Sequence, residues 1–178
     1  MKHPGHIFKN YFPHAERLEI PRRTLLLREG EISNTIFFLE DGIARLWFNQ
    51  EGKDITFQFF FKNSSVSSIE SLYENKPSLF NLETITPCSV KKITKAQFLD
   101  KMDTSPTFER SIHQIISKRL FHYQKLFLSR IKDSPQKRYE ELLQKEPELL
   151  LNIPHHYIAS YLGITSVSFS RIRNRKLI

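Results

Sequence analysis

The side chains best suited to a chemical task lie between residues 158 and 173, close to the C-terminus. Apolar side chains spaced three and four apart on both sides of Gly163 predict two short helices joined there. The outward positions of the second helix are short, polar or basic: Ser166, Val167, Ser168, Ser170, Arg171 and Arg173. A helix with such a face can enter the major groove of DNA, where a guanidinium can bind guanine.

The remaining positions of this helix pair are those that two crossing helices must bury. They are apolar or small: Ile158, Ala159, Leu162, Ile164, Phe169 and Ile172. Gly163 supplies the unusual backbone of the tight turn. An ordinary helical hairpin with solvated arginines is the alternative interpretation.

Charge favours the DNA interpretation. The chain carries a net charge of +8, and residues 105–178 hold 13 basic and 6 acidic side chains. Residues 155–178 contain no acidic side chain at all. A solvated face stabilised by pairs of opposite charge would mix the two signs.

Composition excludes several other classes of protein. Cys88 is the only cysteine of the 178 residues, so an internal disulfide or a cysteine-ligated iron–sulfur cluster is excluded. The sequence shows no apolar run of about 20 residues, as a membrane span would need. We therefore expect a soluble, cytoplasmic protein. His3, His6 and His14 lack the ligand spacing of a metal site, so we expect no bound metal.

Residues 18–93 have the pattern of an antiparallel β-roll. Six segments rich in β-branched and aromatic residues predict strands: 24–27, 35–39, 44–48, 55–61, 82–86 and 89–93. Dipeptides ending in Gly30, Gly42 and Gly52 predict turns between them. Short strands at regular spacing favour a sandwich or jelly roll over a parallel sheet.

Helices are predicted on both sides of this region. Amphipathic residues near Phe8 suggest a short N-terminal helix, and residues 95–102 suggest another. A long helix begins at Pro106 and carries an apolar stripe: Ile112, Ile116, Leu120, Tyr123 and Phe127. We interpret this stripe as a dimer interface, the alternative being a helix that packs wholly on its own domain. Ser134-Pro135 predicts the start of the next helix.

These elements, in this order, resemble the Crp/Fnr family of bacterial transcription regulators. The resemblance rests on residues 27–31 (LREGE), 39–45 (LEDGIAR), 137–139 (KRY) and 158–165 (IASYLGIT). It implies an α+β fold in three parts: a cyclic-nucleotide-binding-like β-roll sensor (1–104), a long dimerisation helix (105–132) and a helix-turn-helix DNA-binding domain (133–178). Few residues follow Arg173, so we expect no full β-hairpin wing, as in the short Bacteroidetes-type form.

The resemblance also implies partners and contact residues. It implies a homodimer on a palindromic operator in double-stranded DNA, with RNA polymerase as a further partner. Ser166, Val167 and Arg171 align with base-reading positions, and Thr165 and Ser168 align with phosphate-contacting positions. Ser170 belongs to the same DNA-facing surface. His155 and His156 could approach phosphate, and non-specific contacts or simple solvation are expected for these two and for Arg173, Arg175 and Lys176.

The chain departs from the family in the effector pocket. A cyclic-nucleotide cassette carries a Gly-Glu pair for the ribose and an Arg-Ser or Arg-Thr pair for the phosphate. The aligned positions here are Ser67-Ser68 and Ser78-Leu79. A cyclic phosphate would lack its charge-assisted partner there, so we expect no cAMP and no cofactor; a different small-molecule effector, or none, is the expectation.

Three functional hypotheses remain to be compared. The first is a sequence-specific transcription regulator without enzymatic activity. The second is a small-molecule-binding β-roll module whose C-terminal helices bind a protein partner; salt-dependent DNA binding separates these two. The third, a metal-dependent cupin-type enzyme, is set aside because no histidine lies between Ala15 and Ile112.

Overall fold

A computed structural model describes residues 4–145 and 147–175 of the chain. The chain divides into two compact units. The first, called here the β-roll unit, comprises residues 1–48 and 58–117. The second, the C-terminal unit, comprises residues 49–57 and 118–178. The long helix contributes residues to both units.

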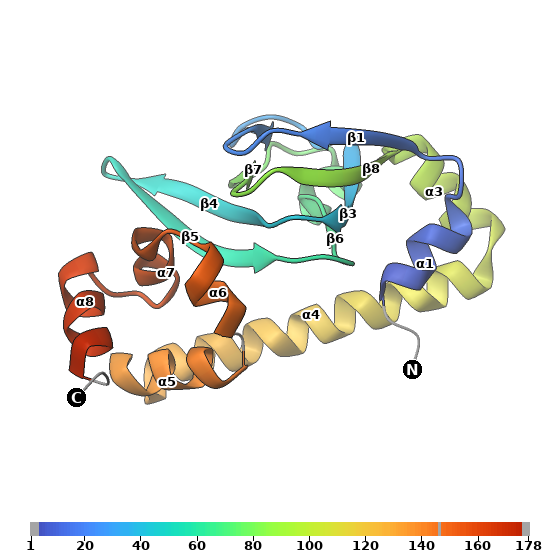
Figure 1. The fold of residues 1–178 in the computed structure, drawn as a ribbon. Helices are drawn as coiled ribbons and strands as arrows, with labels where there is room; N and C mark the ends of the chain where they lie inside the picture. The colour runs from blue at the N-terminus through green and yellow to red at the C-terminus, as the bar shows by residue number, and fades with distance from the viewer. Residues whose placement is uncertain (1–3, 146, 176–178) are drawn as a thin grey trace. The chain divides into compact units, whose positions relative to one another are not determined.

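The strands form two antiparallel sheets of four strands each (Figure 1). One sheet has the order β1-β8-β3-β6 and the other β2-β7-β4-β5. The strand bounds are β1 Glu16–Ile20, β2 Leu25–Leu27, β3 Thr35–Asp41, β4 Ala44–Gln50, β5 Lys53–Phe60, β6 Ser65–Val66, β7 Asn81–Thr84 and β8 Cys88–Thr94. Each predicted strand is present, and the expected antiparallel β-roll is confirmed in this form.

Gly42 stands where the chain leaves one sheet for the other, between β3 and β4. Its φ is +93°, and a Cβ placed on it would lie 2.5 Å from the carbonyl oxygen of Pro87. Only glycine fits this corner without displacing the neighbouring backbone. The turn predicted from Asp41-Gly42 thus connects two sheets rather than two paired strands.

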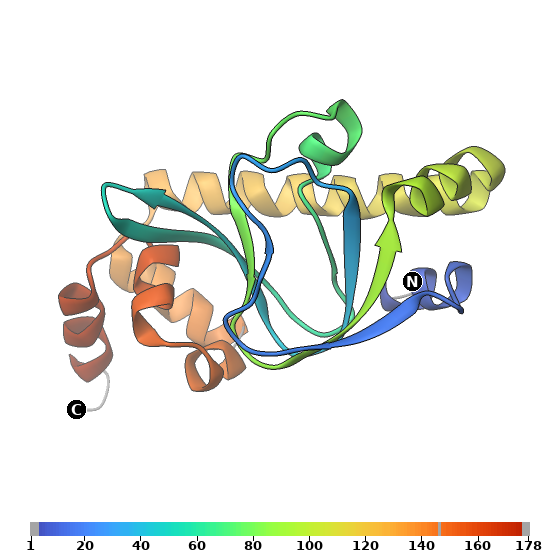
Figure 2. The ribbon, with the colours of Figure 1, turned by 90° about the horizontal axis from the view of Figure 1, so that it is seen from above.

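Helices close one end of the β-roll unit and complete its core. α1 (Pro4–Tyr11), α3 (Lys95–Thr104) and the first part of α4 (Pro106–Lys132) match the predicted helices. α1 and α3 lie at the same end of the unit, as both ribbon views show (Figure 2). The core there consists of buried apolar side chains from these helices and from the strands: Phe8, Phe12, Ile36, Phe38, Leu72, Ile93, Phe98, Phe108 and Ile112.

Three further elements of the β-roll unit were not predicted. These are β1, β6 and the short helix α2 (Ile69–Glu74). β6 has two residues, and α2 has six, too few for a periodic pattern to stand out. α2 nevertheless matters for packing, because its Leu72 is fully buried in the core.

The C-terminal unit contains the end of α4 and four shorter helices. These are α5 (Pro135–Lys145), α6 (Pro147–Asn152), α7 (His155–Tyr161) and α8 (Ser166–Arg175). The predicted cap of α5 is present, since the Ser134 hydroxyl accepts a hydrogen bond from the Lys137 amide at 3.3 Å. α6 was not predicted as a helix. None of the helices in the described part of the chain has the length and apolar character of a membrane span.

Candidate functional site

The α7–α8 pair has the internal packing that the sequence predicts. Ile158, Ala159, Leu162 and Phe169 are all buried. Gly163 has a φ of +68°, and its amide donates to the Ser160 carbonyl at 2.9 Å. The left-handed conformation of Gly163 therefore forms the turn between the helices. Ile164 and Ile172 are only partly buried.

One face of α8 carries exposed side chains that are short or basic. Its exposed members are Ser166, Val167, Ser170 and Arg171. Thr165 occupies the N-cap, where its hydroxyl accepts a hydrogen bond from the Ser168 amide at 3.1 Å. It also donates to the Ser168 hydroxyl at 3.0 Å. The hydroxyls of Thr165 and Ser168, which align with phosphate-contacting positions of the Crp/Fnr family, thus bond to each other in the first turn of α8.

Arg173 differs from its expected place on the outward face. Its side chain is partly buried, and Nη1 lies 3.0 Å from Nδ1 of His155 on α7. The His155 ring in turn lies 5.4 Å from the Phe169 ring, between centroids. Arg173 therefore links the two helices. His156 is exposed, the Arg175 side chain lies outside the described part, and Lys176 lies outside the described residues altogether.

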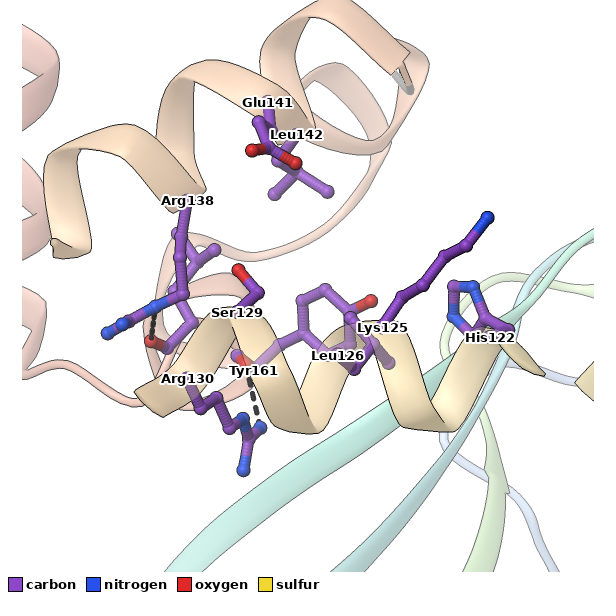
Figure 3. Close-up of a pocket in the computed structure, with 10 residues that line it drawn as sticks. His122, Lys125, Leu126, Ser129, Arg130, Arg138, Glu141, Leu142 and Tyr161 are labelled. Atoms are coloured by element: carbon purple, nitrogen blue, oxygen red, sulfur yellow. Dashed lines mark hydrogen bonds between the residues drawn. The ribbon is translucent and has the colours of Figure 1, made fainter. Parts of the chain in front are cut away.

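Two arginines hold the end of α7 from neighbouring helices. Arg130 of α4 donates to the Tyr161 carbonyl at 2.9 Å, and Arg138 of α5 donates to the Leu162 carbonyl at 3.1 Å (Figure 3). Arg138 also donates to the Asp133 carbonyl at 2.7 Å. Hydrogen bonds from Lys137 and Ser129 lower the pKa of the Asp133 carboxyl. The carbonyls that a helix C-terminus leaves unpaired are thus satisfied by cations.

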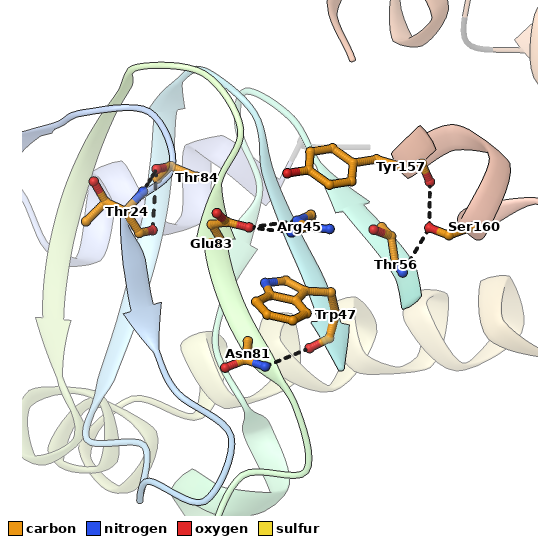
Figure 4. Close-up of polar contacts among 9 residues, drawn as sticks. All are labelled: Thr24, Arg45, Trp47, Thr56, Asn81, Glu83, Thr84, Tyr157 and Ser160. Atoms are coloured by element: carbon orange, nitrogen blue, oxygen red, sulfur yellow. Dashed lines mark hydrogen bonds and ion pairs between the residues drawn. The ribbon is translucent and has the colours of Figure 1, made fainter. Parts of the chain in front are cut away.

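The segment 49–57 contacts α7 within the C-terminal unit. The Thr56 amide donates to the Ser160 hydroxyl at 3.1 Å, and that hydroxyl donates to the Tyr157 carbonyl at 3.0 Å (Figure 4). Thr56 itself is fully buried. The tip of the β4–β5 hairpin therefore belongs to the packing that fixes α7.

A buried ion pair lies in the β-roll unit between β4 and β7. Arg45 Nη2 lies 2.7 Å from the Glu83 carboxylate, and the Arg45 side chain is only 1% exposed (Figure 4). Its guanidinium also lies over the Trp47 ring, 4.8 Å from the centroid. Arg45, the last residue of the LEDGIAR motif (residues 39–45), is thus a buried cation with a structural role.

The aligned effector positions are only partly brought together. A cavity of about 180 Å³ in the β-roll unit is lined by Ser33, Asn34, Thr35 and Ser67, among others. Ser67 and Ser33 share a hydrogen bond at 3.0 Å, and Ser67 also donates to the Thr35 carbonyl at 3.0 Å. The other three aligned positions do not line this cavity: Ser68 and Ser78 are buried, and Leu79 is 70% exposed.

The stripe on α4 is divided between core and surface. Ile112 is 4% exposed and belongs to the core of the β-roll unit, so it cannot contribute area to an interface. Tyr123 is partly buried, and burial raises the pKa of its phenol. The exposed apolar residues of the helix are Ile116, Leu120, Phe121, Phe127, Leu128 and Ile131. Phe121, Leu128 and Ile131 extend the exposed surface beyond the predicted interface set.

Comparison with known proteins gives one family and a set of similar folds. The family model described as the cyclic nucleotide-binding domain matches residues 17–105, half of the chain. This chain belongs to the cyclic nucleotide-binding domain family. A comparison with curated proteins finds no match.

Several solved structures are similar in fold to this member of the cyclic nucleotide-binding domain family, at low sequence identity. The c-di-GMP responsive global regulator CLP of Xanthomonas campestris is 19% identical, with a TM-score of 0.76 over 97% of this chain and 91% of that chain. FixK2 of Bradyrhizobium japonicum is 16% identical, with a TM-score of 0.79 over 90% and 83%. A protein assigned to the crp/fnr family in Eubacterium rectale is 17% identical, with a TM-score of 0.76 over 97% and 83%. At these identities the likeness establishes the fold.

The cavity of the β-roll unit does not fit a cyclic phosphate. The residues that line it include one carboxylate, Glu31, and no basic side chain. Glu31 accepts a hydrogen bond from the Arg28 amide at 2.9 Å. A phosphate placed there would lose its cation and meet a like charge. Among the described residues, no cluster of three or more histidine, cysteine, aspartate or glutamate side chains could hold a metal ion.

Sequence reasoning missed two features of these sites. The cavity of the cyclic nucleotide-binding domain is lined by Ser33 and Asn34, which no motif singled out. The linking role of Arg173 was also missed, although His155 lies 18 residues before it in a region already marked as functional. Both features depend on how separate elements of the chain pack, so the spacing of residues along one helix or strand could not predict them.

Proposed function

We propose that this chain is a DNA-binding transcription regulator of the Crp/Fnr type, without enzymatic activity. The observation that carries this proposal is the exposed face of α8, which bears Arg171 and no acidic side chain. The opposite face is anchored by Phe169, whose ring meets Tyr139 of α5 edge to face at 5.5 Å. A rigidly anchored helix with a short, basic outer face suits major-groove recognition.

Individual roles follow from the exposure of each side chain. Arg171 is the base-reading candidate, because an exposed guanidinium can bind guanine O6 and N7 together. Ser166, Val167 and Ser170 complete the face that meets the bases. The Thr165 hydroxyl caps α8 and is bonded to the Ser168 hydroxyl, so we assign phosphate contact there chiefly to the first-turn amides that this cap does not use.

We further propose that the protein acts as a homodimer through α4. The exposed apolar residues Leu120 and Phe127 lie seven positions apart, on one face of the helix. A solvent-exposed apolar stripe of this kind is stabilised when a second copy covers it. A two-fold dimer would present two α8 helices to half-sites about 34 Å apart.

The sensor is proposed to respond to something other than cAMP. Support comes from the cavity of the β-roll unit, whose lining offers hydroxyls and a carboxylate in place of a phosphate-binding cation. RNA polymerase remains a proposed further partner through the resemblance to Crp/Fnr regulators. A protein partner for the C-terminal helices is the competing proposal, and DNA binding distinguishes the two.

The decisive experiment measures the affinity of the full chain for a random-sequence duplex by fluorescence anisotropy at several salt concentrations. We expect affinity to fall steeply with salt, because phosphate contacts release counterions. Arg171→Glu should weaken binding about tenfold or more. Arg110→Glu, an equal charge change at an exposed position of the β-roll unit, should change it by less than about twofold. Absence of salt-dependent binding would favour the protein-partner alternative.

A further inference from the structure

A second cavity lies wholly within the C-terminal unit. It has a volume of about 300 Å³, is open to solvent on one side, and is lined by the end of α4, by α5 and by the C-terminal end of α7 (Figure 3). Its apolar wall includes Leu126, Leu142 and Leu162. A cavity of this size and lining falls at the lower end of those that hold small organic ligands.

The polar part of the lining is predominantly basic. Lys125, Arg130 and Arg138 line the cavity together with one carboxylate, Glu141. The cavity of the β-roll unit has the opposite character, with Glu31 and no basic side chain in its lining. Charge complementarity therefore selects an anion for the C-terminal cavity and not for the other.

The two arginines of the cavity are already fixed in position. Arg130 and Arg138 donate to the carbonyls of Tyr161 and Leu162, the last residues before the Gly163 turn. A guanidinium carries five N–H donors, more than these carbonyls use, and it can also bind a carboxylate through two parallel bonds. A ligand held by these side chains would contact the groups that determine where α7 ends.

We propose that this cavity binds a small organic anion with an apolar body, such as an aromatic carboxylate. The carboxylate would lie against Arg138 and the apolar body against Leu126 and Leu142, while Lys125 and Arg130, which point in other directions, would add positive charge around the cavity (Figure 3). Occupancy would alter how the arginines hold α7 and thereby shift the populations of α8 orientations. An effector site beside the α7–α8 pair would then act in addition to any site in the β-roll; this regulatory part rests on the proposed DNA-binding function.

Calorimetric titration of the full chain with 2-naphthoate tests the site without DNA. We expect saturable binding, with the neutral analogue 2-naphthamide bound at least about tenfold more weakly because it lacks the charge. Lys125→Glu should weaken naphthoate binding about tenfold. Lys118→Glu is the matched control: it makes the same charge change on the same side of α4, two turns away and outside the cavity lining. It should change the affinity by less than about twofold.

Two results would overturn the site. One is the absence of saturable naphthoate binding; the other is equal affinity of wild type and Lys125→Glu. The effector role is tested separately, by repeating the duplex titration with saturating naphthoate. A shift in duplex affinity of threefold or more in wild type and none in Lys125→Glu supports it, and an unchanged affinity in wild type rejects it. Failure to bind DNA at all would reject the proposed function while calorimetry still decides the site.

Discussion

At the scale of single residues, Arg45 shows how a charge is accommodated inside the β-roll. Its guanidinium is buried, paired with Glu83 at 2.7 Å and placed over the Trp47 ring. Removing one partner of a buried pair leaves the other charge uncompensated, whereas removing both does not. Glu83→Ala should therefore lower the free energy of unfolding by about 3 kcal/mol. The double variant Arg45→Met, Glu83→Leu should lower it by less.

Urea unfolding followed by Trp47 fluorescence measures both variants. Glu40→Ala is the control, because Glu40 pairs at 3.3 Å with Arg17, whose side chain is 64% exposed. A pair with an exposed partner is worth at most about 1 kcal/mol. If Glu83→Ala cost no more than Glu40→Ala, the buried pair would not stabilise the fold as described.

The sequence predicted the environment of some residues correctly and that of others incorrectly. The turn at Gly163 and the burial of Phe169 were predicted, because both follow from local spacing. Arg173 was placed on the solvated face, but it contacts His155, which depends on how α7 and α8 cross. Ile112 was assigned to a dimer stripe and lies in the core, since periodicity cannot tell which apolar face meets its own domain.

At the scale of the element, the stability of α8 depends on its first turn. The Thr165 hydroxyl accepts a hydrogen bond from the Ser168 amide, so Thr165→Ala leaves that amide without its cap. We expect α8 to lose about 1 kcal/mol of local stability. Native-state amide hydrogen exchange within α8 measures this loss. The control is Ser166→Ala at the neighbouring exposed position, and equal exchange in the two variants would contradict the capping role.

The exposed stripe of α4 carries the second prediction at this scale. Phe127 is 65% exposed, and a carboxylate in its place would be buried unpaired in a dimer interface. Phe127→Glu should raise the dimer dissociation constant about 100-fold or more. Analytical ultracentrifugation over a range of concentrations measures it. Gln114→Glu, at an exposed position about 140° away from Phe127 around the helix, should leave it unchanged; a dimer that survives Phe127→Glu would exclude this face.

Element prediction succeeded where length made the pattern clear. α4 has 27 residues and begins at Pro106, as predicted. α6 was missed because Pro147 was taken only as the end of the preceding helix, although proline is also common in the first turn of a helix. α2 has only six residues, and its burial of Leu72 depends on the fold around it.

At the scale of the whole molecule, order along the chain and order in space differ. Segment 49–57, the tip of a hairpin, groups with the C-terminal helices, and Thr56 bonds to Ser160 more than 100 residues later. No local pattern encodes such a contact. The overall architecture could still be predicted, because a β-roll followed by helices produces different periodicities in different parts of the chain.

The central claim, that the molecule reads a DNA operator as a dimer, is tested most directly by selection from random duplexes with the full chain, repeated with Arg171→Ala. The expected result is an enriched inverted repeat whose half-sites are centred about 10 base pairs apart. The substitution should abolish this enrichment. No enrichment by the wild-type protein at low salt would contradict the account.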